Sequence, residues 1–237
     1  MSEDQLAIET HGLSRTYERG EDNAVDALVD VDLAVEAGER IGIMGTSGSG
    51  KSTLLNLLGT LDQPTTGTVW LDGIDPSTLD DDARSRLRNR KIGFVFQQFN
   101  LIPRMTAEQN VALALIPRGV DRATRHERAR EVLADVGLGD RIDHHPNELS
   151  GGQQQRVAVA RALVTEPPIL LADEPTGQVD TETSERLMDL FADLNEQLGL
   201  TIVIVTHDPT VEDHVDRTVH LSDGHVVDEA SYAGAMP

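Results

Sequence analysis

The sequence predicts an α/β fold with a mostly parallel sheet, an antiparallel β subdomain and an inserted helical subdomain. Apolar runs alternate with helix-like stretches, which is typical of α/β domains. The runs are short and rich in Ile, Leu and Val, as expected of strands that are covered on both faces of a parallel sheet. They lie at 41–44, 92–96, 169–172 and 202–205.

Two more strands are expected near the N-terminus. Over residues 29–35, Val and Leu alternate with Asp and Ala, which is the period of a half-buried strand. Residues 68–71 are strand-like and precede Asp72-Gly73, which predicts a turn. These segments are assigned to the antiparallel subdomain.

Helices are predicted where apolar residues recur three and four positions apart. This spacing is followed by Leu187, Leu190, Phe191, Leu194 and Leu198, and over a shorter span by Val132, Leu133 and Val136. No convincing strand interrupts 98–149, so this segment is predicted to be the helical subdomain. No repeat or linker divides the chain. We therefore expect one domain over 5–230, in which 5–97 and 150–230 form the core and the antiparallel part.

The charge balance excludes several classes of partner. Among 237 residues, 41 are acidic and 20 are basic, which gives a formal net charge of -21. A surface this negative repels phosphate backbones and anionic lipid, so neither nucleic-acid binding nor direct lipid binding is expected. Plain solubility explains such a charge. Adaptation to a salt-rich cytoplasm explains it too, and is favoured because only Lys51 and Lys91 are lysines while Asp is abundant.

The chain is expected to be a soluble intracellular protein. It contains no cysteine, which excludes a disulfide framework and suits a reducing compartment. Its longest apolar run, 111–116, is too short to cross a bilayer, and its first residues are acidic where a secretion signal is basic.

A glycine-rich segment between the strand 41–44 and the helix-like 54–58 predicts a phosphate-binding loop, the P-loop. Its glycines let backbone N–H groups approach phosphate, and the helix N-terminus adds positive potential. The lysine is expected to reach the β- and γ-phosphates, and the serine after it to bind Mg²⁺. The predicted nucleotide-binding residues are Gly45, Thr46, Ser47, Gly48, Ser49, Gly50, Lys51, Ser52 and Thr53.

Asp173 and Glu174 follow the apolar strand 169–172. Two successive carboxylates at a strand end divide two tasks in nucleotide hydrolysis. Asp173 is predicted to hold Mg²⁺, and Glu174 to act as the general base on the attacking water. An acidic strand cap is the alternative, and the preceding P-loop makes it the weaker one. The P-loop and this pair predict a P-loop nucleoside triphosphatase core.

The segment Leu149-Ser150-Gly151-Gly152-Gln153 resembles the signature motif of the ATP-binding-cassette (ABC) ATPases. Further segments resemble the other motifs of that family in the same order. Residues 93–97 are similar to its Q-loop, so Gln97 is expected at Mg²⁺ or the attacking water, with Gln98 as a rival. Residues 174–180 are similar to its D-loop, with Asp180 as the aspartate. His207 matches the switch histidine, and Tyr17 matches the aromatic that stacks on adenine.

The resemblance covers residues 5–230 and is strongest to the lipoprotein-releasing and macrolide-export branch. Residues 18–28 are expected to form that branch's extended loop, and 61–67 and 93–103 match it closely. Gln178-Val179 replaces the Asn-Leu that is common in this branch. The replacement leaves Asp180 in place, so it bears on the assignment to the branch more than on the ATPase activity.

The resemblance implies an ATP hydrolase that uses ATP and Mg²⁺. Two chains would sandwich two ATP molecules, with Ser150, Gly151, Gly152 and Gln153 of one chain completing the site of the other. The homodimer would power a separate membrane permease of the export or lipoprotein-release type. The permease would dock near 98–105 and hold the chain at the inner face of the membrane. Two alternatives stay open: an ATPase partner of a cell-division membrane protein, and a soluble ABC ATPase of DNA repair or translation.

Overall fold

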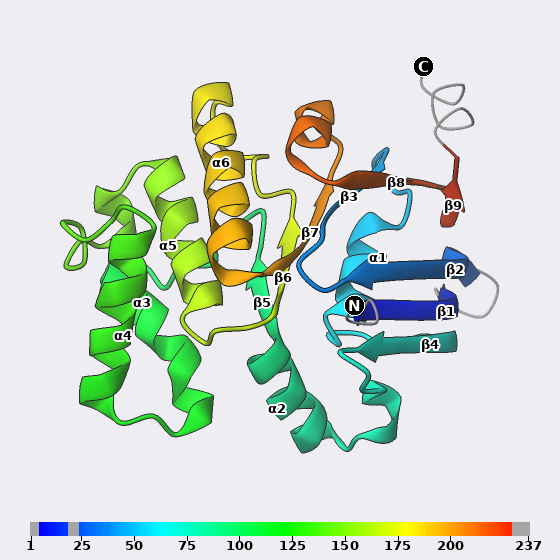
Figure 1. The fold of residues 1–237 in the computed structure, drawn as a ribbon, viewed down its shortest axis with the longest axis horizontal. Helices are drawn as coiled ribbons and strands as arrows, with labels where there is room; N and C mark the ends of the chain where they lie inside the picture. Colours follow the sequence, from blue (N-terminus) through cyan, green and yellow to red (C-terminus); the bar gives the residue numbers. More distant parts are fainter. Residues whose placement is uncertain (1–4, 19–23, 229–237) are drawn as a thin grey trace.

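The structure, a computed structural model, describes residues 5–18 and 24–228. Its centre is a six-stranded sheet in the order β5-β6-β7-β3-β8-β9, parallel except for the last pair (Figure 1). The strands are β3 (Arg40–Gly45), β5 (Ile92–Val95), β6 (Ile169–Asp173), β7 (Thr201–Thr206), β8 (Arg217–Ser222) and β9 (His225–Val227).

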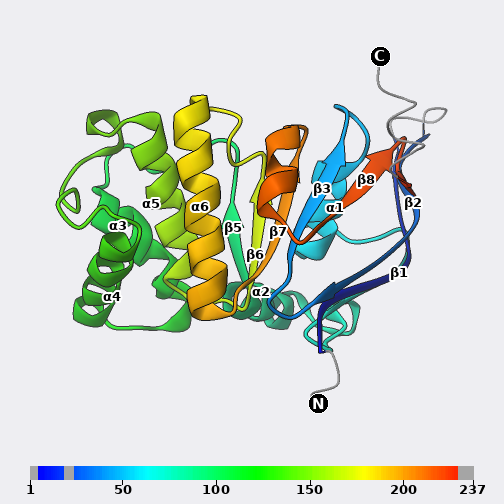
Figure 2. The ribbon, with the colours of Figure 1, turned by 45° about the horizontal axis from the view of Figure 1, so that its top comes forward.

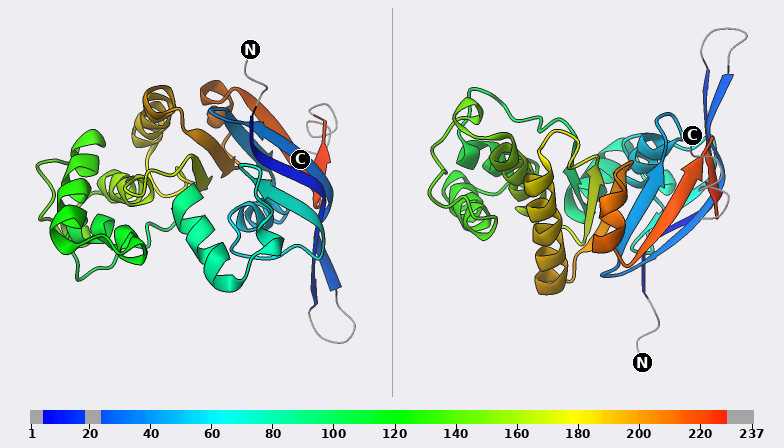
Figure 3. Two further views of the ribbon diagram at one scale, coloured as in Figure 1. Left: turned by 60° about the horizontal axis from the view of Figure 1, so that its bottom comes forward. Right: turned by 90° about the horizontal axis from the view of Figure 1, so that it is seen from above.

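A second sheet of three antiparallel strands has the order β2-β1-β4. It consists of β1 (Leu6–Glu18), β2 (Ala24–Glu36) and β4 (Thr66–Leu71). Figure 3 shows β1 and β2 at the end of the molecule opposite the helices of residues 107–135. This sheet borders the P-loop, because the Ala27 carbonyl of β2 approaches Gly50 closely.

The helices cover both faces of the six-stranded sheet (Figure 2). They are α1 (Lys51–Leu58), α2 (Asp81–Lys91), α3 (Ala107–Ala112), α4 (Arg122–Asp135), α5 (Gly151–Leu163) and α6 (Thr181–Leu198). Short 3₁₀ helices lie at Pro76–Thr78, Leu113–Arg118, Pro146–Glu148 and Pro209–His214. Between β5 and α5, the described residues form helices and loops and no strand.

Strand β7 shows why the apolar runs are unbroken. Its residues Ile202 and Ile204 pack into a core with α3, α4, α5 and α6, while Val203 and Val205 pack into a second core with α1 and the antiparallel sheet. Successive side chains of a strand point to opposite faces. A strand covered on both sides therefore has apolar residues on both faces, as at 202–205, and all six residues of β7 are buried, including the threonines at its two ends.

The structure confirms the α/β class and the six strands expected from the sequence. The expected loop over 18–28 is wrong in part: β2 begins at Ala24 and Glu18 ends β1, while 19–23 lie outside the described residues. Leu198 lies in the helix that the spacing predicts, but it does not join the buried face of α6. It is the last residue of α6 and 63% exposed, because the chain turns away at Gly199 in the left-handed conformation.

Candidate functional site

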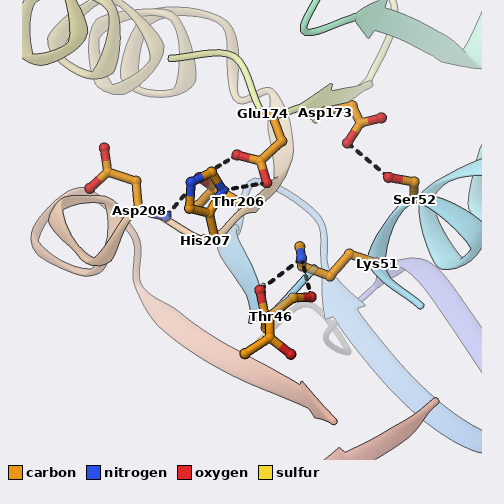
Figure 4. A network of polar contacts seen from close by, with 9 residues as sticks. Thr46, Lys51, Ser52, Asp173, Glu174, Thr206, His207 and Asp208 are labelled. Atoms are coloured by element: carbon orange, nitrogen blue, oxygen red, sulfur yellow. Dashed lines mark hydrogen bonds and ion pairs between the residues drawn. The ribbon is translucent and has the colours of Figure 1, made fainter. Parts of the chain in front are cut away.

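The predicted motifs meet at one edge of the six-stranded sheet. Strands β3, β5, β6 and β7 are parallel, so their carboxyl ends lie at the same edge. The P-loop follows β3, Gln97 follows β5, Glu174 follows β6, and His207 follows β7. Residues separated by more than 150 positions therefore converge, and Figure 4 shows the resulting network of polar contacts.

The P-loop closes onto the first turn of α1. Gly50 has φ +105°, a left-handed value that favours glycine, and a Cβ there would lie 2.4 Å from the Ala27 carbonyl oxygen. The Lys51 ammonium donates to the carbonyl oxygens of Gly45 and Thr46 at 2.7 and 2.9 Å (Figure 4). Burial lowers the pKa of Lys51, while the nearby charges of Glu174 and Asp173 act in the opposite direction.

A cavity of about 600 Å³ joins the P-loop to Gln97, Asp173 and Glu174. It is long enough to extend from the phosphate loop to an aromatic side chain on β1. Its lining residues are Tyr17, Val25, Asp26, Ala27, Ser47, Gly48, Gly50, Lys51, Ser52, Thr53, Gln97, Asp173 and Glu174. Gln98, the rival of Gln97, is not among them in the described part of the chain.

Ser52 and Asp173 offer hard oxygen ligands on facing elements. The Ser52 hydroxyl lies 3.4 Å from Asp173 Oδ1. Burial raises the pKa of Asp173, with a further contribution from Glu174, while Ser52 and Lys51 lower it. Within the described ranges, no three His, Asp or Glu side chains group as a metal cage. Such a sparse donor set fits Mg²⁺, which keeps waters and is held by one or two protein groups plus phosphate.

Glu174 is held from two sides. Its φ is +46°, which is uncommon for a residue with a side chain. The Thr206 hydroxyl donates to Oε2 at 3.1 Å, and His207 Nδ1 lies 2.8 Å from Oε1. Because an ionised carboxylate only accepts hydrogen bonds, this contact assigns the proton to Nδ1 of His207. Thr206 was missed by sequence reasoning, although its place as the last residue of β7, next to His207, was the available signal.

The predicted signature residues lie away from this cavity. Ser150 is exposed and caps α5: its Oγ accepts from the Gln153 N–H at 3.3 Å, and Gln153 Oε1 accepts from the Ser150 N–H at 2.9 Å. In the part of the chain that the structure describes, none of Ser150, Gly151, Gly152 and Gln153 lines the cavity.

Asp180 also begins a helix instead of reaching the cavity. Its carboxylate accepts from the Thr183 N–H at 3.0 Å and from the Thr183 hydroxyl at 2.9 Å, and these bonds lower the pKa of Asp180. Thr183 in turn packs on the signature turn, since a Cβ on Gly152 would lie 2.4 Å from Thr183 Cγ2. The starts of α5 and α6 are therefore in contact.

Comparison with known proteins agrees with this arrangement. Residues 28–177 match the ABC transporter family. The chain is 51% identical over 224 residues to the ABC transporter ATP-binding protein YknY of Bacillus subtilis, which covers 94% of this chain and 96% of that protein. It is 49% identical to the macrolide export ATP-binding/permease protein MacB of Syntrophobacter fumaroxidans over 97% of this chain, but spans only 32% of MacB.

A solved structure shows the same architecture. It is described as the dimeric post-hydrolysis state of the ATP-binding cassette MJ0796, a protein of Methanocaldococcus jannaschii, bound to ADP and Pi. The TM-score is 0.86 at 48% identity, over 93% of this chain and 97% of that one. Fold, motif order and close relatives agree: the chain belongs to the ABC transporter family, as one of its ATP-binding proteins.

Proposed function

We propose that two copies of this chain bind ATP and Mg²⁺ between them and that their hydrolysis of ATP drives a separate membrane permease of the export or lipoprotein-release type. One observation carries the proposal. Lys51, Ser52, Asp173 and Glu174 converge on one cavity, while the glycine-rich turn at Ser150 is exposed outside it. One chain thus offers a nearly complete triphosphate site and a separate anion-binding turn.

The P-loop binds the triphosphate. Backbone N–H groups from Gly45 to Thr53 surround the phosphates, and the first turn of α1 points its N-terminus at them. Lys51 exchanges its two carbonyl partners for β- and γ-phosphate oxygens, which restores strong charge-assisted bonds to a partly desolvated ammonium. Tyr17, at the other end of the cavity, receives the adenine.

The metal site lies between α1 and β6. Ser52 and Asp173 would hold Mg²⁺, the latter through water, and Gln97 would contact the metal or the attacking water. When bound, Mg²⁺ neutralises charge on the β- and γ-phosphate oxygens. Asp173 binds it as the carboxylate, so occupation of the site shifts Asp173 away from the protonated form that burial favours.

Glu174 takes the proton from the attacking water. Each carboxylate oxygen has two lone pairs, so the bonds from Thr206 and His207 leave one on each oxygen for the water. Those bonds fix the carboxylate in the orientation that its left-handed backbone sets. His207 is exposed and contacts Glu174, so its ring is accessible to the γ-phosphate once ATP is present.

The second chain completes the site. Its Ser150, Gly151, Gly152 and Gln153 bring a helix N-terminus and a hydroxyl to the γ-phosphate, and its Asp180 lies beside the contact. ATP joins the two surfaces because its phosphates satisfy donors from both. Hydrolysis and phosphate release remove that bridge, and the difference in affinity between ATP and ADP for the closed dimer performs the work.

The permease is a separate chain in this proposal. No helix in the described ranges is long and apolar enough to cross a membrane, and MacB, of which this chain spans 32%, is by name both ATP-binding protein and permease. A cavity of about 350 Å³, which the segment 98–105 reaches with Asn100, offers the docking groove. It lies between α2, β5 and α5 and is lined by Asn89, Ile92, Gly93, Phe94, Phe96, Asn100, Ala114, Arg161, Ala162 and Thr165.

Docking on a permease would hold the chain at the cytoplasmic face of the membrane. The net charge of -21 further supports a salt-rich cytoplasm, where mutual repulsion of the carboxylates is screened within about 3 Å at 1 M salt. The fraction of folded chain, followed by circular dichroism, should be higher in molar KCl than in dilute buffer. Full stability without salt would contradict this part of the proposal.

The decisive experiment replaces the base. Glu174→Gln removes the proton acceptor but keeps the shape, so hydrolysis should fall by about 10² to 10⁴ while ATP still binds. The variant should then elute as a dimer with ATP and as a monomer with ADP on size-exclusion chromatography. A variant that stays monomeric with ATP would contradict the sandwich mechanism.

A further inference from the structure

Tyr17 is held by two residues that are not among the predicted site residues, Arg15 and Asp62. The Tyr17 hydroxyl donates to Asp62 Oδ2 at 2.7 Å, and the Arg15 guanidinium donates to Asp62 Oδ1 at 2.9 Å. The same guanidinium lies 4.5 Å from the centroid of the Tyr17 ring, within the range of a cation–π contact. Arg15 and Tyr17 are two positions apart on β1, so they share one face of the strand.

This cluster is shielded from water. The side chains of Arg15 and Asp62 are 24% and 25% exposed, which is lower than for most surface ion pairs of this chain. Asp62 also accepts the Gln63 N–H at 2.7 Å, so both of its oxygens are occupied. A partly buried carboxylate with a partner on each oxygen holds its partners more firmly than an exposed pair does.

Asp62 is fixed to the helix that starts at the P-loop. The N–H groups of Leu61 and Asp62 donate to the Asn56 carbonyl oxygen at 2.8 and 3.2 Å, which ties them to the C-terminal part of α1. Lys51 opens the same helix. An eight-residue helix is about 12 Å long and stiff. The phosphate end and the aromatic end of the cavity are therefore connected through one rigid element.

We infer that Arg15 and Asp62 are positioning residues for the nucleotide base: they hold the Tyr17 ring at a set distance from the P-loop, with one face covered by Arg15 and the other open to the base. The inference rests on the proposed function, in which Tyr17 receives adenine. A ring that is already ordered loses less freedom when the base stacks on it. Stacking recognises the area of a base and not its hydrogen-bonding edge.

The test separates base binding from phosphate binding. Tyr17→Phe keeps the ring and removes the hydroxyl, and Asp62→Ala removes the acceptor of both bonds. Each should raise the KM for ATP about tenfold, as expected for the loss of a hydrogen bond to a charged group, with kcat within twofold. The double variant should have the same KM as Asp62→Ala alone, because Asp62→Ala already removes the one bond that Tyr17→Phe removes. Inorganic tripolyphosphate, used as a competitor without a base, should keep its inhibition constant within twofold.

A matched control uses another Arg–Asp pair. Asp216 accepts from Arg40 at 2.9 Å, and neither lines the nucleotide cavity. Asp216→Ala should leave the KM for ATP unchanged even if it lowers the unfolding midpoint as much as Asp62→Ala does. An unchanged KM in Tyr17→Phe and Asp62→Ala, or an equal rise in KM and in the tripolyphosphate constant, overturns the inference. Neither result affects the ATP-dependent dimer of Glu174→Gln, whose absence would instead refute the proposed function.

Discussion

Two helices of this molecule begin at glycine-rich turns, and they are prepared differently. No side chain in the described chain caps the N-terminus of α1, whose cap is the left-handed Gly50, and an ammonium lies beside it. The N-terminus of α5 is already closed by a reciprocal cap between Ser150 and Gln153. The first is open to an anion, while the second is stable when exposed.

This difference teaches how one chain can carry both halves of a divided site. The α1 turn has unsatisfied donors and gains most from phosphate, so it binds ATP first. The α5 turn has satisfied part of its own backbone, so a phosphate must compete with Ser150 and Gln153 for those donors. We expect it to bind only a phosphate that is already held by another subunit.

The largest expected effect comes from a substitution at the glycine-rich turn before α1. Lys51→Ala removes two charge-assisted phosphate contacts, each of which contributes about 1.5–3 kcal/mol, so ATP affinity should fall more than about 100-fold. Isothermal titration calorimetry measures it. Lys91 is the matched control, as the only other lysine; it pairs with Asp72 outside the cavity, and Lys91→Ala should bind ATP normally. Unchanged affinity in Lys51→Ala would refute its assignment.

The next largest effect is expected from a substitution at the glycine-rich turn that begins α5. Gly152→Ala places a methyl group 2.4 Å from Thr183 Cγ2, and overpacking of this kind costs about 1–3 kcal/mol of unfolding free energy. Chemical denaturation should show this loss, together with a lower ATPase rate. Thr183→Ser in the same chain removes Cγ2 but keeps the hydroxyl on Asp180. It should restore stability, and a double variant as unstable as Gly152→Ala would contradict the contact.

The smallest expected effect is a gain in stability, whereas the two substitutions above cause losses. Burial raises the folded-state pKa of Asp173, so its charged form destabilises the nucleotide-free chain above that pKa. Asp173→Asn should therefore increase the unfolding free energy at pH 7, by less than about 1 kcal/mol because solvent screens the carboxylate. The gain should vanish as pH falls below the pKa of unfolded Asp. A loss of stability at pH 7, measured by urea unfolding without nucleotide, would contradict the burial effect.

The sequence predicts most of the parallel sheet because that part is buried on both faces. Strands β3, β5, β6 and β7 consist of apolar residues and glycine except at their ends, where Arg40, Asp173, Thr201 and Thr206 lie, and the motifs follow their carboxyl ends. Strands β1 and β8 mix polar and apolar residues and have several half-buried positions, so neither was expected. Their pairing with distant strands fixes them, and no local pattern encodes it.

The sequence predicts which residues line the candidate site, but it does not predict which residues hold them in place. Lys51, Asp173 and Glu174 were expected at one site because each belongs to a motif with a known role in nucleotide binding or hydrolysis. Contacts between motifs were not expected, since they join residues far apart in sequence: Thr206 on Glu174, Asp62 on Tyr17 and Thr183 on Gly152. Such contacts depend on how helices and sheets pack against one another, and this packing cannot be predicted from the spacing of residues in the sequence.

The contact between Gly152 and Thr183 has one more consequence. Asp180 holds Thr183 through two hydrogen bonds, and Thr183 occupies the space that a side chain on Gly152 would need. The turn at Ser150 therefore cannot slide toward α6 on its own. The starts of α5 and α6 lie about 30 positions apart in the chain but are packed against each other. A motion that tilts one of these helices at the dimer surface is therefore expected to tilt the other.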